Sequence, residues 1–142
     1  MKKKTLPTKT IRQTVEIPAT PVQVYEAIVN PVQHSAFTGT KAAGRMQVGR
    51  TVHAYDGYIT ARVVNLVRGR KIVQAWQTSE WPKGYPPSRL EISLAPSKGG
   101  TRLTMVQSQV PASQASQYTT GWKEYYWRPL KDYFATSNAK NN

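Results

Sequence analysis

The chain has no cysteine, few acidic residues, two histidines and no long apolar run. The lack of cysteine excludes disulfides, thiolate nucleophiles and cysteine metal ligands, and it agrees with a reducing compartment. No segment approaches the roughly 18 consecutive apolar residues that a membrane-spanning helix needs. The basic start of the chain is not followed by the apolar run of a secretory signal. We therefore expect a cytoplasmic protein without a membrane span.

The scarcity of histidine and carboxylate side chains also bears on catalysis. His34 and His53 are the only histidines, and no two carboxylates have a motif spacing. Serine and threonine are plentiful, but none lies in a nucleophile elbow or a Ser-x-x-Lys context, and there is no glycine-rich phosphate loop. The sequence predicts a protein that is not an enzyme and that needs no cofactor and no metal. We expect His34 on the surface of a short helix.

Positive charge is the one extreme of the composition, with 20 lysine and arginine residues against 7 aspartate and glutamate residues and a net charge of +13. Such a charge attracts nucleic acids and anionic surfaces without specificity. The basic residues are scattered, Lys2–Lys4 being the only run, and no recognition motif accompanies them. We do not expect specific nucleic-acid recognition, and non-specific binding to nucleic acid stays an alternative function.

The length of 142 residues fits one domain. Residues 1–9 are basic, contain Pro7 and show no periodicity, so we expect a disordered arm there. Residues 10–136 are predicted to form one folded domain, and residues 137–142 a disordered tail.

The first part of the predicted domain reads as one strand and two short helices. Apolar and polar residues alternate over residues 10–17, which predicts a strand with one buried face. Thr20 and Pro21 have the residue types of a helix N-cap and first turn. Asn30 precedes a second proline, so it ends the first short helix and starts another, which Gly39 closes.

Strands separated by turns are predicted for most of residues 42–110. Asp56-Gly57 is a hairpin signal, and residues 80–87 are too rich in proline and glycine to form a strand. Short turns between consecutive strands favour antiparallel pairing throughout. The predicted strands cover residues 46–49, 51–55, 58–67, 71–77, 90–94 and 103–107.

Seven of the fourteen aromatic residues lie in the short stretch from Tyr118 to Phe134. Their spacing predicts an amphipathic helix of roughly 33 Å from about Gln114 to Ala135, with Ser113 as its N-cap. Pro129 removes a helical hydrogen bond, which predicts a kink nearby. Only a large apolar surface can receive such a helix face.

This element order predicts an α+β helix-grip fold, in which a curved antiparallel sheet of about six or seven strands wraps around the long C-terminal helix. Two short helices follow the first strand. One helix cannot fill the whole concavity, so we expect a cavity between helix and sheet. Its predicted lining consists of Trp76, Gln107, Trp122, Tyr126, Leu130 and Tyr133. The alternative is that the aromatic face is simply core packing.

Two further groups of residues are candidates for binding. Gln74, Gln107 and Gln109 point into the concavity, with Thr60 or Arg62, if the strand register holds. The stiff loop of residues 80–87 exposes aromatic side chains suited to protein contacts. Trp81 and Tyr85 are its predicted partner-contact residues, and the alternative is that the loop folds back over the core.

Seven short motifs occur in a characteristic order along the chain. They are Pro21-Val-Gln-Val-Tyr-Glu-Ala27, Ala36-Phe-Thr-Gly39, Lys71-Ile-Val-Gln-Ala-Trp76, Trp81-Pro-Lys-Gly84, Gly100-Thr-Arg-Leu103, Val110-Pro111 and Gly121-Trp-Lys-Glu-Tyr-Tyr-Trp127 with Pro129-Leu130. In this order they resemble the family named after the activator of the heat-shock protein 90 ATPase, a branch of the START-like or SRPBCC superfamily. The resemblance covers about residues 10–135 and implies the same helix-grip fold.

The resemblance also implies function. Members of the superfamily bind lipids, sterols, polyketides and other hydrophobic molecules under the long helix, so the leading expectation is a small hydrophobic or amphipathic ligand in the predicted cavity. The eukaryotic co-activators look like two-domain proteins with a domain of this type at their C-terminal end. The alternative is therefore a heat-shock chaperone as partner, with a role in the stress response. We expect a monomer.

Overall fold

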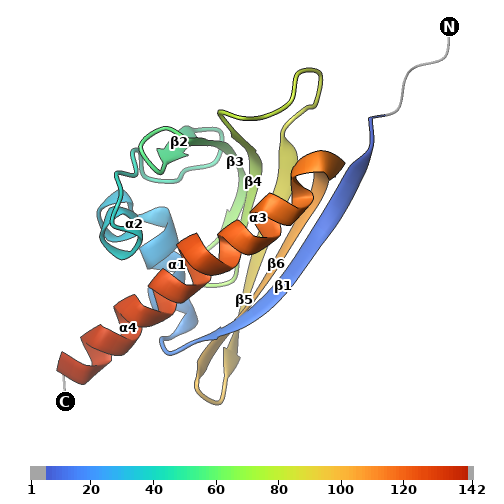
Figure 1. The fold of residues 1–142 in the computed structure, drawn as a ribbon. Helices are drawn as coiled ribbons and strands as arrows, with labels where there is room; N and C mark the ends of the chain where they lie inside the picture. Colours follow the sequence, from blue (N-terminus) through green and yellow to red (C-terminus); the bar gives the residue numbers. More distant parts are fainter. Residues whose placement is uncertain (1–5, 141–142) are drawn as a thin grey trace, which may run out of the picture.

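The computed structural model describes residues 6–140, and in these residues a strand, two short helices and five more strands precede a long helical segment (Figure 1). The elements are β1 (Thr8–Ile17), α1 (Pro21–Val29), α2 (Pro31–Thr38), β2 (Thr51–Ala54), β3 (Ile59–Val67), β4 (Lys71–Thr78), β5 (Ser88–Ser97), β6 (Gly100–Pro111), a 3₁₀ turn (Ala112–Gln114), α3 (Ala115–Trp122), a π-helical turn (Lys123–Trp127) and α4 (Arg128–Lys140).

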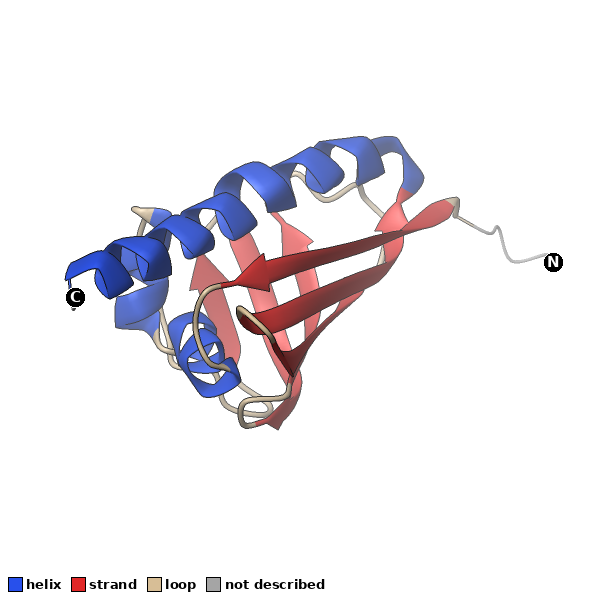
Figure 2. Ribbon diagram, turned by 90° about the horizontal axis from the view of Figure 1, so that it is seen from below, coloured by secondary structure: helices blue, strands red, loops and turns tan. Residues whose placement is uncertain are grey.

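The six strands form one antiparallel sheet in the order β1-β6-β5-β4-β3-β2. Figure 2 shows the long helical segment lying across one face of this sheet. Figure 1 shows α1 and α2 beside the C-terminal half of the long helical segment. The pairing register shifts by one residue between β1 and β6 and between β3 and β4, and such bulges increase the local bend of a sheet. The predicted helix-grip fold is confirmed, with six strands.

Local sequence signals explain the first two helices. Thr20 Oγ1 accepts from the backbone N–H of Gln23 at 3.2 Å, and Gln23 Oε1 accepts from the N–H of Thr20 at 2.8 Å. This reciprocal pair is a capping box, with Pro21 at the first helical position. At the start of α2, Asn30 Oδ1 accepts from the backbone N–H groups of Val32 at 2.9 Å and Gln33 at 3.3 Å, without a reciprocal bond. The predicted starts of both helices are confirmed.

Alternation along the strands separates the core from the outer face of the sheet. In β5, Leu90, Ile92 and Leu94 are buried, whereas Arg89 is exposed and Glu91 only half-buried. A period of two in burial is what a sheet with one covered face requires. The buried face meets the long helix, so the core and any pocket lie between these two layers.

The predicted strand over residues 46–49 is wrong. The N–H of Met46 donates to the carbonyl of Val29 at 3.1 Å, and the Met46 side chain is buried. Gly49 has φ 90°, which breaks an extended conformation. Packing of Met46 beneath the end of α1 therefore replaces strand pairing, and the first strand after the short helices is β2.

The ends of the domain also differ from expectation. β1 begins at Thr8 rather than Thr10, because Thr8 and Lys9 pair with Pro111 and Val110 of β6. At the other end α4 continues to Lys140, past the predicted domain end at residue 136. The rest of the predicted arm and tail, residues 1–5 and 141–142, lies outside the described residues.

The long helix starts and continues less regularly than predicted. Ser113 does not cap it: residues 112–114 form a 3₁₀ turn, and α3 follows without a side-chain cap. Before Pro129 the helix widens into a π turn, in which the N–H of Arg128 donates to the carbonyl of Lys123, five residues back. A π turn is a common way to absorb an irregularity inside a helix, so the disturbance expected from Pro129 takes this form.

Candidate ligand pocket

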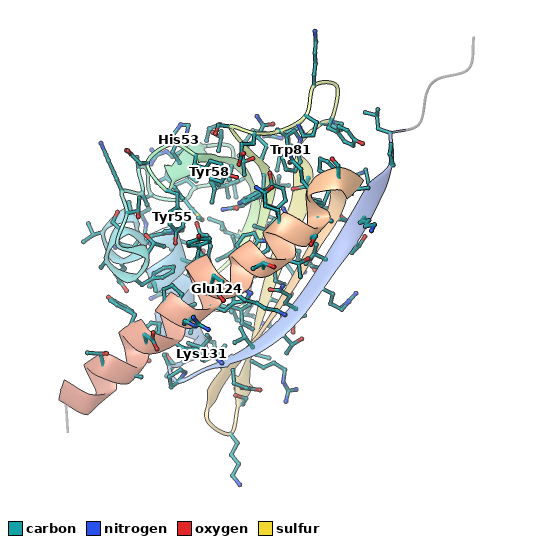
Figure 3. All side chains as sticks on the ribbon, in the orientation of Figure 1. His53, Tyr55, Tyr58, Trp81, Glu124 and Lys131 are labelled. Atoms are coloured by element: carbon teal, nitrogen blue, oxygen red, sulfur yellow. The ribbon has the colours of Figure 1, made fainter. Side chains whose placement is uncertain are left out.

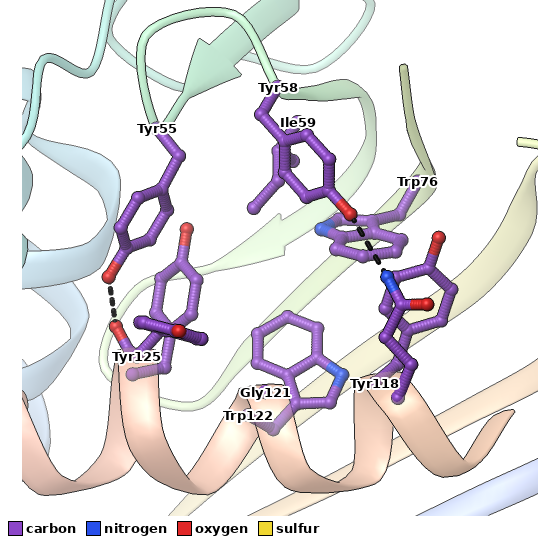
Figure 4. Close-up of a pocket in the computed structure, with 10 residues that line it drawn as sticks. Tyr55, Tyr58, Ile59, Trp76, Tyr118, Gly121, Trp122 and Tyr125 are labelled. Carbon is purple, nitrogen blue, oxygen red and sulfur yellow. Dashed lines mark hydrogen bonds between the residues drawn. The ribbon is translucent and has the colours of Figure 1, made fainter. Parts of the chain in front are cut away.

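A pocket of about 490 Å³ opens between the long helix and the sheet (Figure 4). Its walls come from the β2–β3 turn, the start of β3, β4 and the helical residues up to the π turn. The volume lies within the range of small-molecule sites, about 300 to 1,000 Å³. The lining residues are Tyr55, Tyr58, Ile59, Trp76, Gln117, Tyr118, Gly121, Trp122, Tyr125 and Tyr126.

Two tryptophans form the inner wall. Trp76 of β4 and Trp122 of α3 have ring centroids 5.4 Å apart, and Trp122 stacks on Trp127 at 5.3 Å. The Trp122 indole N–H donates to Gln107 Oε1 at 2.8 Å, and Gln107 Nε2 donates to Ser88 Oγ at 3.0 Å. Because these polar atoms are buried and satisfied, the orientation of the Trp122 ring is fixed.

Tyr126 forms the part of the wall next to α2, and its hydroxyl is hydrogen-bonded to a buried histidine behind the wall. His34 Nδ1 lies 2.9 Å from the carbonyl of Ile28, so this nitrogen carries the proton. His34 Nε2, 3.0 Å from the Tyr126 hydroxyl, must then accept from it. Burial lowers the pKa of His34, which keeps the imidazole neutral, and burial raises the pKa of Tyr126.

The expected surface position of His34 is therefore wrong, since the residue is only 5% exposed. It faces inward because both ring nitrogens find partners there and because its ring packs on Phe37 with a centroid distance of 5.1 Å. A buried polar side chain with all its hydrogen bonds made carries little penalty.

The outer edge of the pocket is a tight turn with a tyrosine on each side. Tyr55, Asp56 and Gly57 have φ values of 49°, 55° and 92°, so the turn uses the left-handed region that Asp and Gly tolerate. The Tyr55 hydroxyl donates to the carbonyl of Tyr125. On the other side, Gln117 Nε2 lies 3.3 Å from the Tyr58 hydroxyl. Two hydrogen bonds thus link the turn to the long helix (Figure 4).

The Tyr58 hydroxyl also donates to Glu80 Oε1, which lies 3.3 Å from Gln117 Nε2. Burial raises the pKa of Tyr58 to about 12, and the hydrogen bond to Glu80 adds to the effect. Burial also raises the pKa of Tyr55 to about 12. Both phenols are therefore neutral at physiological pH.

The predicted lining residues fall into two groups. Trp76, Trp122 and Tyr126 line the pocket. Gln107 lies behind Trp122 and supports it through a hydrogen bond. Leu130 is fully buried in the core, and Tyr133 is half-buried against Phe37 of α2, with ring centroids 6.3 Å apart. The short helix α2 therefore fills the space that we expected beside Leu130 and Tyr133.

The other predicted polar residues do not form one group. Gln74 is buried, with Nε2 3.2 Å from the sulfur of Met46. Gln109 has φ 63° near the bulge between β1 and β6 and is exposed, as is Arg62. Thr60 Oγ1 lies 3.3 Å from His53 Nδ1 at the surface. The bulge turns Gln109 outward, so the predicted inward position is wrong for Gln109 and Arg62, whereas Gln74 and Gln107 are buried as predicted.

The loop of residues 80–87 folds back over the edge of the pocket wall. The Trp81 ring stacks on Tyr118 with a centroid distance of 5.9 Å, and its indole N–H donates to the carbonyl of Pro86 at 3.0 Å. The Tyr85 hydroxyl donates to the carbonyl of Pro7 at 2.9 Å. Figure 3 shows Trp81 beside Tyr58, next to the start of α3. Both side chains keep exposed surface, so contact with a partner protein stays a prediction.

The described residues contain neither a cluster of metal-binding side chains nor a helix suited to a membrane span. Within residues 6–140, no three histidine, aspartate or glutamate side chains lie close enough together to hold a metal ion. No helix in that part of the chain is both long and apolar enough to cross a membrane.

A curved antiparallel sheet that grips a long helix, with an aromatic pocket between the two, defines a START-like domain. Residues 18–135 match the family described as "Activator of Hsp90 ATPase homolog 1-like protein", and the chain belongs to this family. The resemblance noted in the sequence is confirmed.

Curated relatives from other organisms share sequence identity with most of this chain. It is 30% identical over 132 residues to the activator of 90 kDa heat shock protein ATPase homolog of Dictyostelium discoideum, which covers 92% of this chain and 34% of the relative. Over 126 residues it is 24% identical to homolog 2 of the same activator in Mus musculus, covering 89% and 38%. The chain thus spans about a third of the length of the curated relatives it matches.

A solved structure shows the shared fold. The HSP90 activator from Plasmodium falciparum superposes with a TM-score of 0.78 at 17% identity, over 89% of this chain and 96% of that one. At such an identity the likeness concerns the backbone arrangement, and the chemistry of this pocket follows from its own side chains.

Proposed function

We propose that this protein binds a small hydrophobic or amphipathic ligand between the long helix and the sheet, without catalysing a reaction. The observation that supports this best is the pocket of about 490 Å³ with aromatic walls. An aromatic face that only served as core packing would be filled to the density of a protein interior. Here Trp76, Trp122 and Tyr126 pack on neighbours and also border open space.

Fixed walls favour binding over collapse of the pocket. Trp122 is tied to Gln107, Tyr126 to His34, and Tyr118 to Thr78 at 2.7 Å. A pocket whose side chains are already ordered loses less conformational entropy when a ligand enters. The same ties limit how far the rings can move into the space when it is empty.

The titratable groups support a role in binding rather than catalysis. A general acid or base works best with a pKa near the operating pH. Burial instead raises the pKa of Tyr55 and Tyr58 to about 12 and lowers that of His34, whose two nitrogens are already used in hydrogen bonds. None of these groups is poised to exchange protons with a ligand.

A variant that fills the pocket tests the proposal. Gly121 lines the pocket on the helix, and a Cβ atom there would meet only Tyr125 Cδ2, at 3.9 Å. We expect Gly121→Leu to fold normally and to abolish binding of lipids and aromatic amphiphiles, followed by amide chemical shifts and tryptophan fluorescence. Thr120→Leu is the matched control, because residue 120 is exposed on the same helix. Shifts confined to the surface, or equal binding by Gly121→Leu, would contradict the proposal.

Contact with a heat-shock chaperone is the second candidate. Its support is the family, together with relatives named as activators of the 90 kDa heat shock protein ATPase. In this reading Trp81 and Tyr85, on the loop beside the pocket, are contact residues. The test is the ATP turnover of the cognate chaperone with this protein in excess, comparing wild type with Trp81→Ala. Unchanged turnover with the wild-type protein would remove this candidate and leave the ligand proposal untouched.

A further inference from the structure

Most of the tyrosine hydroxyls around the pocket act as hydrogen-bond donors to acceptors of the protein itself. Five tyrosines line the pocket, and four of them donate their hydroxyl protons to other groups of the protein. The four bonds run from Tyr55 to the Tyr125 carbonyl, from Tyr58 to Glu80, from Tyr118 to Gln114 Oε1 and from Tyr126 to His34 Nε2. With their protons used in this way, these hydroxyls can offer a ligand only acceptor lone pairs.

Donors for an anionic ligand are correspondingly scarce. The indole N–H of Trp122 is used by Gln107 at 2.8 Å. For the Trp76 indole N–H, no hydrogen-bond partner occurs among residues 6–140, so it is a single neutral donor. The fifth tyrosine, Tyr125, is 61% exposed. The lining contains no lysine, arginine or histidine, although the chain has 20 basic residues. A carboxylate or phosphate would find neither a cation nor a set of converging donors.

Instead, the carboxylate of Glu80 lies at the edge of the pocket beside Tyr58 and Gln117, which we call the mouth. Glu80 Oε1 contacts the Tyr58 hydroxyl and, at 3.3 Å, Gln117 Nε2, and both of these residues line the pocket. Glu16, Glu26, Glu91 and Glu124 each form an ion pair with an arginine. Glu80 forms none with any described residue, so its charge is not neutralised locally.

Aromatic ring faces complete the arrangement. The negative face of a tryptophan or tyrosine ring attracts a cation within about 6 Å, most strongly where water is excluded. Trp76 and Tyr118, with ring centroids 5.3 Å apart and edge to face, and the neighbouring Trp122 supply such rings to the pocket lining. Ring faces, acceptor hydroxyls and one carboxylate together favour positive charge at the mouth.

On the basis of the proposed function, we propose that the ligand is a cationic amphiphile, with its apolar part against the wall formed by Trp76 and Trp122 and its ammonium group at the mouth beside Tyr58 and Glu80. This selectivity opposes the net charge of +13, which would draw anions to the protein. A preference for a cation would therefore come from the pocket and could not be an effect of overall charge.

Three ligands with the same n-decyl chain separate head group from tail: decyltrimethylammonium, decanol and decanoate. Binding is followed by tryptophan fluorescence and calorimetry below the micelle-forming concentrations, at mildly alkaline pH and physiological ionic strength to screen the surface charge. We expect decyltrimethylammonium to bind at least about tenfold more tightly than decanoate, with decanol between them. Gly121→Leu is expected to weaken all three.

Glu80→Gln tests the source of the selectivity. We expect it to weaken decyltrimethylammonium about threefold to tenfold and to leave decanol unchanged, because one nearby charge is lost. Glu91→Gln removes the same charge from the outer face of the sheet and is expected to change neither. Equal binding of the three ligands, tighter binding of decanoate, or no effect of Glu80→Gln would overturn the cationic assignment and leave the proposed function standing. Failure of all three ligands to bind would overturn both.

Discussion

The hydroxyl of Tyr55 donates a hydrogen bond to the backbone carbonyl of Tyr125, the carbonyl that Pro129 leaves without its normal helical donor. The bond joins the β2–β3 turn to the π turn of the long helix. A residue 70 positions away in the sequence thus donates to a carbonyl whose i+4 helical donor the proline removes. The same bond closes one side of the pocket.

Tyr55→Phe removes this donor and keeps the ring. We expect the free energy of unfolding to fall by about 1 kcal/mol, because the Tyr125 carbonyl is near enough to solvent to be hydrated in part. Urea unfolding measures the loss, and amide exchange around residues 123–130 should become faster. Tyr125→Phe is the control, since its own hydroxyl is exposed, and it should change stability by less than about 0.5 kcal/mol. Equal losses in the two variants would refute a role for this bond.

The buried pair of His34 and Tyr126 predicts a dependence of stability on pH. Burial lowers the pKa of His34 in the folded protein, so in mildly acidic solution the unfolded chain binds the proton more readily. The contribution of His34 is therefore complete above the ordinary histidine pKa of 6.5 and is lost as the pH falls through the lowered folded-state value. Urea unfolding between about pH 8 and pH 5 should show stability falling with pH.

Two histidine variants show whether the pH dependence of stability comes from His34. His34→Asn removes the titrating group, so it should flatten the profile; it should also lower stability by about 1 to 3 kcal/mol, because the Tyr126 hydroxyl loses its acceptor. His53→Gln, at an exposed residue, should keep the wild-type profile. A wild-type slope that survives in His34→Asn would assign the pH dependence to another group.

The turn between β5 and β6 brings Gly100 against the end of β1. Its φ is 141°, and a Cβ atom there would lie 2.4 Å from the carbonyl oxygen of Ile17 and 2.7 Å from the backbone nitrogen of Ala19. We expect Gly100→Ala to lower the free energy of unfolding by about 2 kcal/mol or more, since backbone must move. Gly99→Ala, where a Cβ atom meets nothing within 4 Å, should be nearly neutral in the same chemical denaturation. Similar stabilities for the two variants would show that the turn adapts freely.

The fold could be predicted well because its signals are local. Alternating residues, the caps at Thr20 and Asn30 and the short turns define the element order, and the aromatic face around Trp122 requires a large receiving surface. The segment of residues 46–49 was predicted wrongly because burial of Met46 beneath α1 outweighs strand propensity. Tertiary contacts of this kind leave no periodic signal.

The pocket could be predicted only in part. The helical spacing gives Trp122 and Tyr126, but the opposite wall comes from Tyr55 and Tyr58, which follow no period. The one available signal was a tyrosine on each side of the predicted Asp56-Gly57 turn. His34 could not be placed either, because its partner Tyr126 lies 92 residues further along the chain. Such pairings depend on the packing of α2 against the long helix.

Gln107 lies behind the pocket wall and holds the Trp122 ring in place. A variant at this residue therefore tests whether ligand binding needs a fixed orientation of that ring. The residue is fully buried, accepts from the Trp122 indole and donates to Ser88. Gln107→Leu leaves these two buried groups without their partner, and we expect a loss of about 1 to 3 kcal/mol in unfolding free energy. Because the Trp122 ring is then free to shift, ligand binding should weaken and the tryptophan emission of the folded protein should change.

A double variant separates the lost hydrogen bond from the changed shape. Trp122→Phe keeps an aromatic ring but has no indole N–H to satisfy, so in Gln107→Leu/Trp122→Phe no orphaned donor remains. The double variant should therefore be about 1 kcal/mol more stable than the sum of the two single losses predicts. Additive losses would mean that packing alone holds Trp122. The pocket wall would then depend on shape, and the link from Gln107 to ligand affinity would be lost.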